Sequence, residues 1–135
     1  MDSPHILQGV KVLVVDDEPD TLELLRMVLE LRGASVVTEN SAAQALERFK
    51  ETAPDVLLSD IGLPGKDGFD FIREVRSLPP ERGGRVPAVA LTAYTRAEDR
   101  TTTLAAGFDM HIPKPVQPAD VVAVVASLTA RMSDR

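Results

Sequence analysis

The chain alternates five times between a short apolar run rich in β-branched residues and a longer segment with apolar residues at helical spacing. The first run, residues 10–15, is almost continuously apolar, as expected for a strand buried on both faces. A series of this kind builds a parallel sheet covered by helices on both faces. The expected strands are residues 10–15, 35–38, 56–58, 86–91 and 108–112; the expected helices run from Pro19 to before Gly33, from Ser41 through Phe49, around Phe69 to Val75, and over 96–106 and 119–130.

Residues typical of helix ends support this division. Pro19 is favourable at a first helical position, and Ser41 is a good N-cap. Gly33 and Gly107 are typical C-caps. The last two helices have the weakest intrinsic propensity, because they contain a run of three threonines at 101–103 and a valine-rich final segment. Their apolar periodicity and their place in the alternation still predict helices.

The length and charge of the chain narrow its class. At 135 residues, one domain is expected, over residues 9–130, with a lead-in at 1–8 and a tail at 131–135. No apolar run approaches the roughly 18–20 residues of a membrane-spanning helix, so no membrane insertion is expected. With zero cysteines, disulfides and thiolate metal sites are excluded, which fits a cytoplasmic location. A net charge of −6 argues against direct nucleic-acid binding.

Polar residues follow four of the five expected strands. Ligands of open parallel sheets bind at the carboxyl ends of the strands, so these residues are candidates for one shared site. The second strand ends in Thr38 and Glu39, which we expect to lie at the sheet edge, outside the site. The candidate residues are Asp16, Asp17, Asp60, Thr92 and Lys114.

Each of these residues alone has an ordinary structural explanation, such as a helix cap, a turn, a strand end or a solvated charge. Together they predict more, because three carboxylates on one edge repel one another unless a cation neutralises them. Oxygen ligands without cysteine favour Mg²⁺ over zinc or copper. The hydroxyl of Thr92 and the ammonium of Lys114 would complete a site for phosphoryl oxygens around one carboxylate nucleophile.

Four segments of the chain resemble the motifs of response-regulator receiver domains, and they occur in the family's order. They are residues 12–19 (VLVVDDEP), 60–68 (DIGLPGKDG), 90–93 (ALTA) and 112–115 (IPKP). The similarity extends from Gly9 to Leu128. It implies the flavodoxin-like (βα)5 fold, a doubly wound five-stranded parallel sheet in the order 2-1-3-4-5.

The resemblance also implies roles for the candidate residues. Asp60 would accept a phosphoryl group from a phosphohistidine of a histidine kinase or a histidine phosphotransfer domain. Asp17 and Asp60 would bind Mg²⁺, with Asp16 acting through water. The Gly62 backbone carbonyl would be a further ligand of the metal. The phosphoryl group would be contacted by the Thr92 hydroxyl, the Ala93 backbone N–H and Lys114. Such a chain phosphorylates and dephosphorylates itself and is not expected to be a turnover enzyme.

Some positions depart from the family pattern or tune it. The switch position usually carries Tyr or Phe, but here it is His111. This histidine is either a pH-sensitive switch or an imidazole at the edge of the sheet without a switching role. Gly62 and Tyr94 occupy positions that tune dephosphorylation in the family, and we predict no sign for their effect. The peptide between Lys114 and Pro115 is expected to be cis, as it usually is in the family.

Other classes of protein fit the sequence less well. A Mg²⁺-dependent phosphatase of the haloacid-dehalogenase type would have its nucleophile after the first strand and a second Asp two residues later, whereas here Asp16 is followed by Asp17 and Glu18. A flavin-binding module would carry a Ser/Thr-rich phosphate loop after the first strand, and this chain lacks such a loop there. A P-loop nucleotidase is not supported, because its Gly-x-x-x-x-Gly-Lys-Ser/Thr motif is absent.

The context of the domain is less constrained. Residues 7–10 and 107–115 resemble receivers fused to histidine kinases, so we predict the receiver of a hybrid histidine kinase, with a free-standing response regulator as the alternative. Leu22, Met27 and Leu31 broaden the apolar stripe of the first helix and make it a candidate docking surface. The fourth helix, fifth strand and fifth helix, with Val122 as an exposed apolar residue, form a competing surface. A homodimer is a further candidate assembly.

Overall fold

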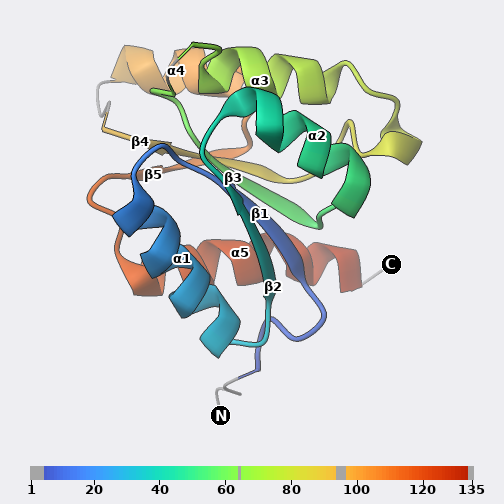
Figure 1. Cartoon of the computed structure of the whole chain (residues 1–135), viewed down its shortest axis with the longest axis vertical. Coiled ribbons are helices and arrows are strands. Elements are labelled where there is room, and N and C mark those ends of the chain that lie inside the picture. The colour runs from blue at the N-terminus through green and yellow to red at the C-terminus, as the bar shows by residue number, and fades with distance from the viewer. Residues whose placement is uncertain (1–4, 64, 94–96, 134–135) are drawn as a thin grey trace.

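The computed structural model describes residues 5–63, 65–93 and 97–133 and contains a five-stranded parallel sheet in the order β2-β1-β3-β4-β5 (Figure 1). This order confirms the predicted doubly wound fold. The strands are β1 (Lys11–Val15), β2 (Ser35–Glu39), β3 (Val56–Asp60), β4 (Ala88–Thr92) and β5 (Met110–Pro113). The helices are α1 (Pro19–Leu31), α2 (Ala42–Thr52), α3 (Gly68–Arg76), the 3-10 turn Pro80–Arg82, α4 (Ala97–Ala106) and α5 (Pro118–Ser133).

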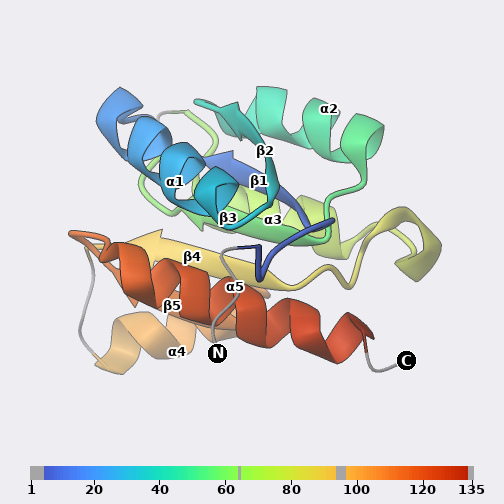
Figure 2. The ribbon, with the colours of Figure 1, turned by 90° about the horizontal axis from the view of Figure 1, so that it is seen from below.

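Helices cover both faces of the sheet. In Figure 1, α2, α3 and α4 lie above the sheet and α1 and α5 below it, and Figure 2 shows α1 beside α5. The side chains of β1 alternate between two cores, since Leu13 and Val15 join the cluster under α2 and α3, whereas Val12 and Val14 join the cluster under α1 and α5. All four are at most 1% exposed. The near-continuous apolar run therefore reflects burial on both sides, as predicted.

The helix ends follow from the residues that the sequence places there. Pro19 is the first residue of α1, and the Ser41 hydroxyl accepts a hydrogen bond from the Gln44 backbone N–H at 3.3 Å. Gly33 follows α1 with a φ of +98°, a conformation that favours glycine. The two segments with weak helix propensity form α4 and α5, so tertiary packing of their apolar residues outweighs the propensity.

β1 begins one residue later than predicted, and two other strand starts differ by two residues. We expected strands from residues 86 and 108, but β4 begins at Ala88 and β5 at Met110. Pro87 precedes β4 and has no N–H to donate to a neighbouring strand. Phe108 lies between α4 and β5, where its N–H donates to the Thr103 carbonyl of α4 and its side chain is 3% exposed in the core. Apolar character alone did not distinguish the residues that precede β4 and β5 from the residues of these strands.

The N-terminal segment packs on the domain. Leu7, in the predicted lead-in, is 0% exposed, and its N–H donates to the Arg32 carbonyl at 2.8 Å. None of the helices in the described part of the chain is long and apolar enough to cross a bilayer.

The apolar residues singled out on α1 and α5 divide into two groups. Met27 and Leu31 are 54% and 69% exposed, as predicted for a broadened stripe. Leu22 instead packs against the core, and Val122 is half-buried. Val122 lines a groove of about 510 Å³ between α1 and α5, so its side chain is partly accessible and less exposed than we expected.

Candidate functional site

The sheet carries the candidate residues to one edge. Asp16 directly follows β1, Asp60 ends β3, Thr92 ends β4, and Lys114 directly follows β5. The Lys114 backbone N–H donates to the Thr92 carbonyl at 2.8 Å, which fixes the end of β5 against β4. Asp60 and Thr92 are 7% and 2% exposed. Because parallel strands end at the same side of the sheet, the predicted convergence occurs.

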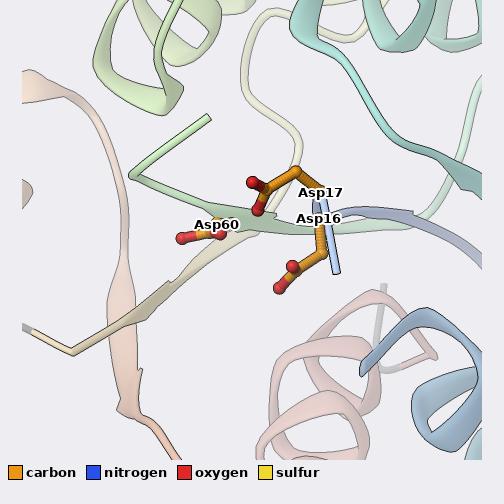
Figure 3. Close-up of side chains that lie close together, drawn as sticks. All are labelled: Asp16, Asp17 and Asp60. Carbon is orange, nitrogen blue, oxygen red and sulfur yellow. The ribbon is translucent and has the colours of Figure 1, made fainter. Parts of the chain in front are cut away.

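Three carboxylates form the centre of this edge. Asp16, Asp17 and Asp60 each offer one carboxylate oxygen, and these oxygens lie within 4.8 Å of one another (Figure 3). Backbone N–H groups orient two of them: Glu18 donates to Asp16 Oδ1 at 2.9 Å, and Gly62 donates to Asp60 Oδ1 at 3.1 Å. Asp16 is fully buried, whereas Asp17 is exposed. The cluster is therefore held by the backbone and opens to solvent on the Asp17 side.

Lys114 is the cation of the site. Its Nζ lies 3.0 Å from Asp16 Oδ2, 3.0 Å from Glu18 Oε1 and 3.1 Å from Asp60 Oδ2. Burial alone would lower the pKa of this ammonium, but hydrogen bonds and charge interactions with the carboxylates outweigh burial and raise the pKa above its ordinary value. Lys114 therefore stays charged at neutral pH and points at the oxygen of Asp60.

Asp16 shows that the cluster fits a hard cation. Burial raises the pKa of its carboxyl group, the Glu18 N–H and Lys114 lower it in part, and the charge of Asp60 raises it further. Its Oδ2 atom accepts no hydrogen bond among the described residues, although Lys114 Nζ lies at ion-pair distance. A buried carboxylate oxygen without a hydrogen-bond donor, beside two other carboxylates, suits an oxygen-coordinating ion such as Mg²⁺.

We expect Asp16→Asn to raise the melting temperature of the metal-free protein at neutral pH. Because the pKa of Asp16 is raised in the folded state, its ionisation destabilises the fold as pH rises above the ordinary value of about 3.9. The Asn variant avoids this loss, so its advantage should shrink toward about pH 4. Thermal melts in a chelator across pH measure this. Added Mg²⁺ should stabilise wild type more than the variant; an advantage unchanged by pH contradicts the prediction.

Gly68 supports the loop that carries Asp60. It begins α3, is buried, and its N–H donates to the Ile61 carbonyl at 2.9 Å. A Cβ at this position would overlap the Asp60 carbonyl oxygen and lie 2.7 Å from the Ile61 Cα. The start of α3 therefore packs directly against the backbone of the site.

Gly68→Ala is expected to lower the free energy of unfolding by about 2 kcal/mol, because backbone atoms must move to admit the methyl group. The same movement should displace Asp60 and weaken Mg²⁺ binding. Chemical denaturation and a Mg²⁺ titration measure the two effects. Gly65→Ala is the control, since a Cβ there meets nothing within 4 Å, although its φ of +73° adds local strain. Unchanged Mg²⁺ affinity in Gly68→Ala contradicts this prediction.

The remaining predicted positions are placed less centrally. Gly62 is exposed, and a Cβ there would lie 4.0 Å from Asp60 Oδ1. Ala93 is exposed directly after β4, and His111 is half-buried in β5, paired with Ala90. Tyr94 lies outside the described residues. The peptide between Lys114 and Pro115 is cis, as expected.

Sequence reasoning missed two contributors to the site. Glu18 forms an ion pair with Lys114, and Gly68 packs on Asp60. Both residues belong to motifs quoted above, so their positions carried a signal, but their contacts did not follow from it.

Comparisons with known proteins agree with this geometry. The model of the response regulator receiver domain family matches residues 12–126. A 14.6 kDa protein of Leptolyngbya boryana is 44% identical over 119 residues, covering 88% of this chain and 89% of that protein. The transcriptional regulatory protein TrcR of Mycobacterium tuberculosis is 36% identical over 124 residues, covering 92% of this chain and 47% of TrcR. The structure of the chemotaxis response regulator CheY4 of Vibrio cholerae is 27% identical, with a TM-score of 0.82, covering 88% of this chain and 98% of that one.

Proposed function

The chain belongs to the response regulator receiver domain family, and from that premise we propose that Asp60 accepts a phosphoryl group from a phosphohistidine, with Mg²⁺ bound beside it. The observation that carries this proposal is the position of Asp60 between a charged ammonium and two further carboxylates. Lys114 Nζ lies 3.1 Å from Asp60 Oδ2, and the oxygens of Asp16 and Asp17 lie within 4.8 Å of the Asp60 oxygen. One carboxylate is thereby presented to a donor in a site suited to phosphoryl oxygens.

The proposed reaction is a single displacement at phosphorus. A carboxylate oxygen of Asp60 attacks the phosphorus atom and forms a P–O bond while the P–N bond of the phosphohistidine breaks. The electron pair of that bond leaves with the imidazole, whose protonation from the solvent then depends on the pH of the solution. The product is an acyl phosphate on Asp60, and water can later attack its phosphorus to release phosphate and restore the carboxylate.

The surrounding residues bind and orient the transferred group. Lys114, which would keep its charge throughout, would donate a hydrogen bond to a phosphoryl oxygen. The Thr92 hydroxyl and the Ala93 backbone N–H, at the end of β4, would donate to the other oxygens. Preorganised donors of this kind stabilise charge that develops during transfer.

The metal would be held by the carboxylates of Asp17 and Asp60 and the backbone carbonyl of Gly62, with Asp16 acting through water. When bound, Mg²⁺ neutralises the negative charge of the phosphoryl oxygens and of the carboxylates. The burial of Asp16 Oδ2, which accepts no hydrogen bond among the described residues, and the exposure of Asp17 support this assignment.

The partner and context extend the proposal. A histidine kinase or histidine phosphotransfer domain is the class of donor that this chemistry needs, and the cytoplasm is the proposed location. The chain spans about half of TrcR but nearly all of the Leptolyngbya boryana protein. The regulators compared above support a response regulator as the parent. Placement in a hybrid kinase rests on residues 7–10 and 107–115 alone and, like a homodimer, stays a prediction.

The experiment for this proposal is phosphotransfer from a phosphorylated histidine domain, followed by intact-mass measurement of the acceptor. Uptake of one phosphoryl group at Asp60 supports the proposal. A phosphatase would instead hydrolyse a small phosphate ester through many turnovers without a stable phosphoprotein. Enzyme-like release of phosphate from such an ester would favour that alternative and contradict the receiver mechanism.

A further inference from the structure

Glu18 occupies the N-cap position of α1 but does not cap the helix with its side chain. Short side chains such as Ser, Thr, Asp and Asn are preferred there because their oxygens accept backbone N–H groups of the first turn. Among the described residues, Glu18 makes no such side-chain hydrogen bond. Its Oε1 atom instead accepts from Lys114 Nζ at 3.0 Å, across 96 residues of sequence. The side chain is therefore committed to the site and not to the helix.

The Lys114 ammonium already lies among carboxylates. It carries three N–H donors, and three carboxylate oxygens lie within 3.1 Å of it. A phosphoryl oxygen on Asp60 must compete with these carboxylates for the ammonium. The order in which they yield decides how readily Lys114 is available.

Burial indicates which carboxylate yields. The side chains of Asp16 and Asp60 are 0% and 10% exposed, whereas that of Glu18 is 62% exposed. A buried carboxylate that loses its cation is left with an uncompensated charge, which is costly. An exposed carboxylate exchanges its ion pair for water at little cost. Glu18 is therefore the partner that Lys114 can leave.

Glu18 also stands at an opening beside the site. A cavity of about 470 Å³ is lined by Glu18, Asp20, Lys114 and residues of α1 and the loop after β5. From this side Glu18 contacts Lys114. Resting on the function proposed above, we propose that Glu18 is a positioning residue that holds Lys114 in the free protein and competes with the phosphoryl group for its ammonium.

The test uses beryllofluoride, a phosphoryl mimic, titrated into the full chain at saturating Mg²⁺ and followed by backbone amide resonances. Glu18→Gln keeps the size of the side chain and removes its charge. Its dissociation constant for beryllofluoride should fall about two- to fivefold, the range expected for one exposed ion pair. This gain should shrink as salt rises, because salt weakens the competing pair in wild type.

Asp20→Asn is the matched control. It removes one negative charge from the same cavity, but Asp20 is not among the three carboxylates that contact Lys114 in the described chain. Its dissociation constant should stay within a factor of about 1.5 of wild type. An equal gain in Asp20→Asn, or no gain in Glu18→Gln, overturns the role of Glu18. Equal beryllofluoride binding by wild type and Asp60→Asn would instead overturn the proposed function itself.

Discussion

Asp60→Asn is expected to abolish covalent uptake of a phosphoryl group from acetyl phosphate in the presence of Mg²⁺. A neutral amide oxygen is a poor nucleophile and a weaker ligand for Mg²⁺ than a carboxylate, so both the attacking atom and part of the metal site are lost. Asn has nearly the same shape, and the N–H of Gly62 still finds an oxygen at this position. Intact-mass measurement after a timed incubation detects the modified protein directly.

A matched substitution separates the site from the general loss of a negative charge. Asp70 is exposed on α3, where it lies 3.6 Å from Arg73 in an ordinary surface ion pair. Asp70→Asn should take up phosphoryl groups at the wild-type rate. If wild type and Asp60→Asn gain equal mass, the acceptor is another residue and the proposed function is wrong. Circular dichroism melts of all three proteins exclude unfolding as the cause of a loss.

Arg76→Met is expected to lower the free energy of unfolding by about 3 kcal/mol, or the melting temperature by about 10 °C. The Arg76 guanidinium donates to the carbonyls of Gly84, Val86 and Gly107 at 3.0, 2.7 and 2.9 Å, and to Asp109 Oδ2 at 3.0 Å. It thereby joins the end of α3 to the chain before β4 and to the end of α4. A methionine fills the space but removes the donor to the three carbonyls, whereas Asp109 Oδ2 still accepts from the Ala88 N–H at 2.8 Å.

Arg73→Met, on the same helix, is the control for this prediction. Its side chain is 59% exposed, so its loss should change stability by no more than about 0.5 kcal/mol. Arg76→Lys should lose most of the stability that Arg76 contributes, because one ammonium cannot replace a planar group with five donors. Burial lowers the pKa of Arg76 and Asp109 opposes this, yet an arginine keeps its charge. Similar melts for Arg76→Met and Arg73→Met would show that this network does not stabilise the fold.

The gathering of the site residues at one edge could be predicted without coordinates. Asp60 ends a strand and Lys114 directly follows one, and parallel strands carry such residues to the same side of a sheet. The alternation of β1 between the two cores follows equally directly, because neighbouring side chains of a strand point to opposite faces. These features depend on strand direction and period, which local residue patterns encode.

The contacts of long charged side chains could not be predicted in this way. Glu18 follows two metal-site carboxylates and resembles any exposed acid at a helix start, and Arg76 resembles any basic residue in a last helical turn. Lys114, the partner of Glu18, lies 96 residues away in the sequence, and Asp109, a partner of Arg76, lies 33 residues away. Many acids and bases in the chain could pair equally well by type, so sequence alone does not select among them.

The amino-acid sequence by itself therefore determined the βα alternation, the edge of the sheet that carries Asp60, and the chemistry of the residues there. Only the tertiary structure decided that Glu18 occupies Lys114, that Gly68 must be small beside Asp60, and that Arg76 binds three carbonyls. The physical reason is the range of the forces involved. Periodicity arises from hydrogen bonding and burial of neighbouring residues, whereas these contacts depend on which distant segments the packed sheet brings within about 3 Å.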